Sequence, residues 1–325
     1  MPFLRERSGN LSYEKIGALI LVLFPLTYVI WLGLNGGFAA PQPFGGLGPP
    51  PGGGGLGGGG LGGGGLGGGG LGGGGGLGGE SALGARPLIE VIRFIGDWSI
   101  RLLLVTLAVT PARRLFNWPK LLAARRTLGL GAAFYVALHF TFYFIDIGNV
   151  PTAVKEIFLR VYLTIGFIAL LGLLVLSATS WDGAIRRMGA DRWGRLHTLS
   201  YPILALGLLH FFMQQKLDVT QPTLMAGMFL WLMGWRFLQR AGHGSGLVPM
   251  LALAVGAGIA TALLEAGWYL AATGIDPVRV LSANLAFDYS IRPAWWVFGL
   301  GVAITIVSEI VLRLRPLPVR RAARA

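Results

Sequence analysis

The sequence predicts an all-α protein that crosses a membrane several times. Of its 325 residues, 54% are hydrophobic and 13% are charged, and the mean hydropathy is +0.64. Soluble domains are charged at about 25% of positions. Apolar runs of helix-spanning length recur, and backbone in lipid must satisfy its own hydrogen bonds, so these runs are expected to be helices. Lys and Arg gather between the runs, as in cytoplasmic loops, which accounts for the net charge of +13 without a nucleic-acid partner.

About eight spans are expected, with both termini on the cytoplasmic side. The first run could instead be a signal peptide, but its length favours a retained helix. The basic segments 111–126 and 180–195 and the C-terminal tail then share one side of the membrane with the N-terminus. The expected spans are residues 16–34, 89–110, 128–147, 161–179, 196–213, 222–238, 248–272 and 295–312.

Composition divides the chain into four parts. Residues 1–35 hold an N-terminal tail and the first span, and residues 36–84 form a Gly/Pro-rich tract with GGGGL repeats. Glycine loses too much entropy on ordering for such a tract to form a core, so we expect a disordered outer loop. Residues 85–240 form the membrane core, and residues 241–325 form a two-helix extension with a basic tail.

Three of the four histidines, His139, His197 and His210, lie in apolar runs. An ionisable side chain in lipid is costly and usually functional, and neutral imidazole is a common axial ligand of haem iron. The chain has no cysteine, which excludes a covalently attached c-type haem and cysteine-ligated iron–sulfur clusters. The sequence therefore favours a membrane cytochrome with non-covalent haem.

Depth in the membrane separates these histidines into two levels. His139 and His210 lie about 12 and 14 residues into helices of the same direction, or ~18–21 Å from the cytoplasmic end, so they are expected to share one iron. His197 lies ~20 Å from His210 along the axis and suits a second, inner haem. An ideal helix would place those two side chains ~140° apart, and Pro202 between them can kink or rewind it.

The inner level has no second histidine, and Arg126 occupies the matching depth on the third span. An arginine there can pair with a haem propionate or a flavin phosphate. A purely structural role, a hydrogen bond to a neighbouring helix, is the alternative for each intramembrane histidine. His243 lies in a loop and is expected to have no role, and Glu265 and Glu309 are expected to pair with helix-end groups.

The core contains three long motifs, RRTLGLGAAFYVALHFTFYFID, RVYLTIGFIALLGLLVLSATS and RRMGADRWGRLHTLSYPILALGLLH. In their sequence and spacing they resemble a known family, the MsrQ (YedZ) haem-binding membrane subunits of MsrPQ methionine sulfoxide reductase systems. The resemblance covers about 16–35 and 85–240, and both the glycine tract and the last two spans depart from it.

The resemblance implies a six-helix, ferric-reductase-like haem-binding core in a bacterial inner membrane. It implies one or two b-type haems held by His139, His197 and His210, and FMN. It further implies that electrons pass from the quinone pool or a cytosolic flavin reductase to MsrP, a periplasmic molybdopterin enzyme that repairs oxidised methionine in periplasmic proteins.

Two other functions stay open from the residues. One is a transmembrane ferric or other metal-ion reductase, and the other is a haem-free membrane scaffold. No nucleotide-binding motif is present in the sequence, so a separate reductase or membrane quinol would have to supply electrons.

Overall fold

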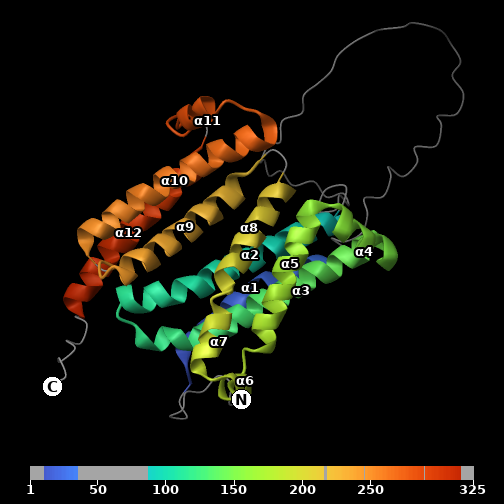
Figure 1. Ribbon diagram of the computed structural model, residues 1–325, viewed down its shortest axis with the longest axis horizontal. Coiled ribbons are helices and arrows are strands. Elements are labelled where there is room, and N and C mark those ends of the chain that lie inside the picture. Colours follow the sequence, from blue (N-terminus) through green and yellow to red (C-terminus); the bar gives the residue numbers. More distant parts are fainter. Residues whose placement is uncertain (1–10, 36–86, 216–217, 245, 289, 316–325) are drawn as a thin grey trace, which may run out of the picture.

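The computed structural model describes residues 11–35, 87–215, 218–244, 246–288 and 290–315. Helices make up most of these residues, and none of the described residues forms a β-strand, which confirms the all-α polytopic class. The long helices pack side by side, with α4 and α11 at the opposite end of the bundle from α6 and α7 (Figure 1). The predicted glycine-rich loop lies outside the described residues.

A long helix occupies each of the eight expected ranges. Six segments are long and apolar enough to cross a membrane, and these contain α1, α3, α5, α8, α10 and α12. The helices α2 and α9 have a lower mean hydropathy because both carry several charged and polar residues. The bounds are α1 Tyr13–Leu34, α2 Pro87–Leu115, α3 Ala124–Ile147, α5 Val161–Ala178, α8 Ser200–Gln214, α9 Thr220–Arg240, α10 Leu247–Thr273 and α12 Pro293–Leu314.

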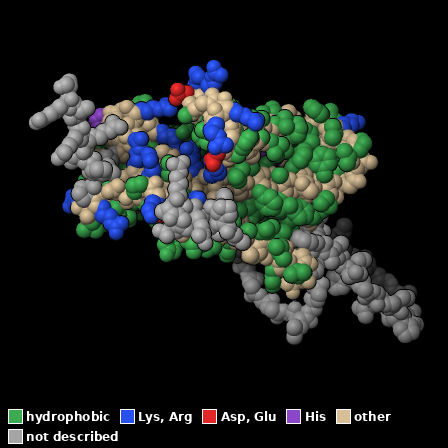
Figure 2. Space-filling view, turned by 90° about the horizontal axis from the view of Figure 1, so that it is seen from below, with side chains coloured by type: hydrophobic (Ala, Val, Ile, Leu, Met, Phe, Trp, Pro, Cys, Tyr) green, Lys and Arg blue, Asp and Glu red, His purple; other side chains and the backbone are tan. Residues whose placement is uncertain are grey.

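The surface agrees with a membrane location. A broad apolar area covers one part of the molecule, and most Lys and Arg side chains in that view gather beside it (Figure 2). Large apolar side chains are exposed along the outer faces of the helices, for example Ile168 on α5 and Ile306 on α12. Such an exposed apolar area is expected where lipid replaces water as the solvent.

Short helices occupy segments that the sequence suggested were loops. These are η2 (Pro119–Ala123), α4 (Val150–Leu159), α6 (Asp182–Met188), α7 (Ala190–His197) and α11 (Pro277–Ala283).

Residues in the first turn explain why α4 forms a helix. The Asn149 side chain accepts a hydrogen bond from the Thr152 N–H, and Pro151 occupies an early position where its missing N–H costs nothing. The helix then buries Ala153 and Ile157.

Residues 190–214 form one candidate span, and the helix expected over 196–213 tightens within it at Thr198 and Leu199, between the end of α7 at His197 and the start of α8 at Ser200. Pro202 has no N–H to donate to the carbonyl of Thr198, which instead accepts from the Tyr201 N–H at 3.1 Å. A tightened turn therefore lies between His197 and His210 along this span.

The C-terminal extension is anchored by a buried carboxylate. Glu265 of α10 is fully buried, and its two oxygens accept hydrogen bonds from Arg292, before α12, at 3.2 Å and from Asn284, after α11, at 3.1 Å. Glu309 pairs with Arg313 on its own helix. Both glutamates thus pair near helix ends, as the sequence analysis expected.

We expect Arg292→Ala to destabilise the protein by about 3 kcal/mol, the lower end of the range for breaking a buried pair, because Arg292 is itself partly exposed. Thermal unfolding in detergent measures this loss. Arg313→Ala is the matched control, since its pair is exposed and worth about 0–1 kcal/mol. Equal melting temperatures for the two variants would contradict a structural role of the Glu265 pair.

Candidate functional site

Two of the predicted histidines meet inside the helical core. His139 of α3 and His210 of α8 have ring centroids 6.3 Å apart, and their ring planes are nearly perpendicular at 89°. They are separated by 71 positions in sequence and come together because α5 packs against both α3 and α8. The structure therefore brings together the pair that depth along the helices had matched.

Each ring is held by a backbone carbonyl of a neighbouring helix. His139 Nδ1 lies 2.8 Å from the carbonyl oxygen of Ile92 on α2, and His210 Nδ1 lies 2.7 Å from that of Tyr162 on α5. A carbonyl oxygen only accepts, so Nδ1 of each ring carries the proton. This tautomer makes Nε2 the nitrogen with a lone pair, which is the usual preparation of a histidine for metal binding.

Glycines allow the helices to approach these rings. A Cβ at Gly96 of α2 would lie 3.0 Å from His139 Nδ1, and a Cβ at Gly166 of α5 would lie 2.7 Å from His210 Nδ1. Real Cβ atoms are almost never found as close to another atom as the 2.7 Å at Gly166. Any larger residue at Gly166 would push the imidazole away from its carbonyl partner.

The arrangement fits the iron of a haem. With a metal–nitrogen bond of about 2.0 Å and a ring centre about 1.1 Å beyond it, two imidazoles on opposite sides of one ion have centroids ~6 Å apart. The described residues contain no group of three or more His, Cys, Asp or Glu that could hold a metal ion. A two-histidine site suits a metal whose other ligands come from a porphyrin.

His197 lies elsewhere, at the end of α7. Its ring stacks on Trp193 with centroids 4.0 Å apart, and its Nε2 lies 3.2 Å from the Thr179 hydroxyl. His197 contacts neither of the other two core histidines in the part of the chain that the structure describes. The structure thus gives it stacking and hydrogen-bonding partners but no second imidazole.

Arg126 binds a carboxylate at the surface. Its Nη2 lies 2.6 Å from Asp182 Oδ1 at the start of α6, and both side chains are largely exposed. The next residue toward the N-terminus, Arg125, is half-buried and interacts electrostatically with His197 and Tyr201. Counting residues along the helix could not show that the more buried guanidinium would be Arg125 and not Arg126.

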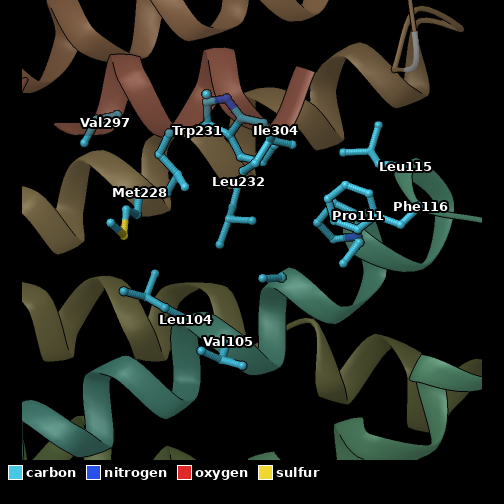
Figure 3. Close-up of a pocket in the computed structure, with 14 residues that line it drawn as sticks. Leu104, Val105, Pro111, Leu115, Phe116, Met228, Trp231, Leu232, Val297 and Ile304 are labelled. Carbon is cyan, nitrogen blue, oxygen red and sulfur yellow. The ribbon is translucent and has the colours of Figure 1, made fainter. Parts of the chain in front are cut away.

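A separate cavity of about 230 Å³ lies between α2, α9 and α12 (Figure 3). Its lining residues include Pro111 of α2, Phe116 directly after α2, Met228 and Leu232 of α9 and Val297 of α12. The lining is almost wholly apolar and contains no histidine. The cavity is therefore distinct from the histidine pair. It lies between two helices of the core, α2 and α9, and α12 of the C-terminal extension.

One known protein family matches the central part of the chain. Residues 95–208 match the family described as ferric reductase like transmembrane component. This range contains His139 and His197 and ends two residues before His210. No solved structure matches the chain.

Curated relatives are similar over about half of the chain. A protein of Xanthomonas campestris pv. campestris is 45% identical over 164 residues, which is 50% of this chain and 75% of the relative. A protein of Caulobacter vibrioides is 42% identical over 159 residues, 47% of this chain and 74% of the relative. Both are named protein-methionine-sulfoxide reductase heme-binding subunit MsrQ. Because three quarters of such a relative is covered at this identity, the chain belongs to the MsrQ family of ferric-reductase-like membrane proteins.

Proposed function

We propose that this chain is a membrane b-type cytochrome that holds haem between His139 and His210 and carries electrons across a bacterial inner membrane. The observation that carries the proposal is the pairing of these rings, with centroids 6.3 Å apart and each Nδ1 bound to a carbonyl. The MsrQ relatives are named as heme-binding subunits of a methionine sulfoxide reductase. Bound haem would supply one-electron chemistry, and the protein would supply two neutral imidazole ligands in a dry, fixed geometry.

The partners follow from the same family. We propose a periplasmic MsrP-like molybdopterin reductase as electron acceptor, in repair of oxidised periplasmic proteins. The donor is the quinone pool or a cytosolic flavin reductase, and FMN is the second cofactor. The basic segments between the helices support cytoplasmic termini. His197 is proposed as the ligand of an inner haem, and Arg126 as a contact of a propionate or flavin phosphate.

The proposal is tested by a reduced-minus-oxidised absorbance spectrum of the purified full-length protein, with haem counted as the pyridine haemochrome. We expect a b-type spectrum and at least one haem per chain. Protein expressed with ample haem that contains none would refute the cytochrome and leave a membrane scaffold.

A metal-ion reductase is the second candidate, favoured by the match to the ferric reductase like transmembrane component. Reduced protein supplied separately with an MsrP-like enzyme and with a ferric chelate distinguishes the two functions. Faster reoxidation by the enzyme supports the electron-transfer subunit, and faster reoxidation by the chelate supports the metal-ion reductase.

A further inference from the structure

The short helix α4 carries exposed apolar side chains at one end of the bundle. It lies at the ends of α3 and α5 (Figure 1), and its 10 residues make it about 15 Å long, which is too short to cross a membrane. Arg160, the residue after α4, has extended backbone angles of φ −108° and ψ 108°. The chain therefore changes direction between α4 and α5, and α4 is not part of a spanning helix.

The apolar side chains of α4 form two neighbouring sectors around the helix axis. Successive residues turn by about 100°, so the buried Ala153 and Ile157 lie about 40° apart and face the bundle. Val150, Val154 and Phe158 follow on one flank in steps of about 40°. These three side chains are 60%, 41% and 72% exposed. The apolar surface of α4 is thus wider than the part that packs on the bundle.

The other flank of α4 is mostly polar. Thr152 and Glu156 lie there about 40° apart, and Lys155 lies between them and the apolar flank. Leu159, in the last position of the helix, is the one apolar side chain on this side. A helix with an apolar flank and a polar flank, too short to span, has the pattern of helices that lie in the interface between lipid and water.

Contacts with both neighbouring helices fix the direction in which these flanks point. The Thr164 hydroxyl of α5 donates to the Ile157 carbonyl at 2.6 Å. The Tyr143 hydroxyl of α3 donates to the Glu156 carboxylate at 3.4 Å, and Arg160 donates to the same carboxylate at 3.0 Å. Since α4 is attached on its buried and polar sides, its apolar flank stays directed away from the bundle.

Exposed apolar surface continues from this flank onto the spanning helices. Ile145, near the end of α3, is 58% exposed, and Val161, at the start of α5, is 66% exposed. Further along α5, Ile168 is also exposed, and α5 is long and apolar enough to cross a membrane. Lipid covers such a surface on a spanning helix. The flank of α4 extends this surface at the end of the bundle.

We propose that Val150, Val154 and Phe158 form a lipid-binding face that seats α4 in the interface of a phospholipid bilayer. The face lies among the headgroups and the first carbons of the acyl chains, and the polar flank faces water. The Lys155 stem can lie along the apolar surface while its ammonium reaches the lipid phosphates. This inference goes beyond the proposed function and does not depend on bound haem.

The test places a single spin label at chosen positions of the full-length protein. The chain has no cysteine, so Phe158→Cys and Val154→Cys each give one site for a nitroxide label. Thr152→Cys on the polar flank is the matched control, and Ile168→Cys on α5 is the reference for a lipid-facing site. The labelled proteins are reconstituted into vesicles of phosphatidylcholine and phosphatidylglycerol. Electron paramagnetic resonance then compares collisions with oxygen, which concentrates in lipid, and with a water-soluble nickel complex.

We expect the labels at Phe158 and Val154 to lie about 5–10 Å into the boundary between headgroups and acyl chains, shallower than the label at Ile168. The label at Thr152 should collide freely with the nickel complex. Equal access of the nickel complex to Phe158 and Thr152 would place the face in water and overturn the proposal. Shielding of Phe158 and Val154 from both reagents would show that protein, such as a second copy of the chain, covers the face, and would also overturn it.

Discussion

Replacing His210 by alanine is expected to abolish haem binding at the pair with His139. The ring of His210 is proposed to supply one of the two nitrogen ligands of the iron. Losing the hydrogen-bond partner of a ligand lowers metal affinity by roughly 10- to 100-fold, and losing the ligand itself lowers it further. The measurement is haem per protein by pyridine haemochrome, together with the absorbance spectrum of what remains. His243→Ala is the control, because this histidine is exposed in the link between α9 and α10.

The pairing itself has a sharper test in the double variant. Because His139 and His210 are proposed to bind one iron, their substitutions should not add: His139→Ala with His210→Ala should lose no more haem than either change alone. Separate and additive losses would show that the two rings serve different sites. Full haem in His210→Ala would refute the pair altogether.

The second large effect is expected at a residue with no functional group. Gly166→Ala adds one methyl group that would lie 2.7 Å from His210 Nδ1, so the imidazole must move away from the Tyr162 carbonyl. Loss of this outer contact is expected to lower haem affinity by roughly 10- to 100-fold. Haem retention during dilution or competition with apomyoglobin measures the change.

The control for this substitution is another helical glycine. A Cβ at Gly256 of α10 would meet nothing within 4 Å, and glycine-to-alanine changes inside helices are usually favourable by up to about 1 kcal/mol. Gly256→Ala should therefore keep its haem and melt at the same or a higher temperature. If Gly166→Ala binds haem as the wild type does, close packing against His210 has no part in holding the ligand.

The sequence predicted the positions of the long helices because their apolar runs are long and bounded by charge. It also predicted that His139 and His210 lie at one depth, since depth depends only on residue count along a helix. It could not predict the carbonyls of Ile92 and Tyr162 as their partners, because every residue has a carbonyl. Gly96 and Gly166 likewise resemble any other glycine in a membrane helix until the packing is known.

Two details of the inner level have local causes that residue counting does not capture. The helix expected over 196–213 tightens at Thr198 and Leu199 because Pro202 removes one backbone donor. Arg126 was preferred at the inner level by counting residues. On a helix, adjacent residues point about 100° apart, and the structure places Arg125 on the inward side and Arg126 beside Asp182.

The orientation of His210 depends on a helix other than its own. The cap formed by α6 and α7 joins α8 through the tightened turn at Thr198 and Leu199, at the end of α8 away from His210. His210 is oriented from α5, through Tyr162, which lies far from that cap along the helix. Substitutions in α6 and α7 are therefore expected to leave the alignment of the His139 and His210 rings unchanged.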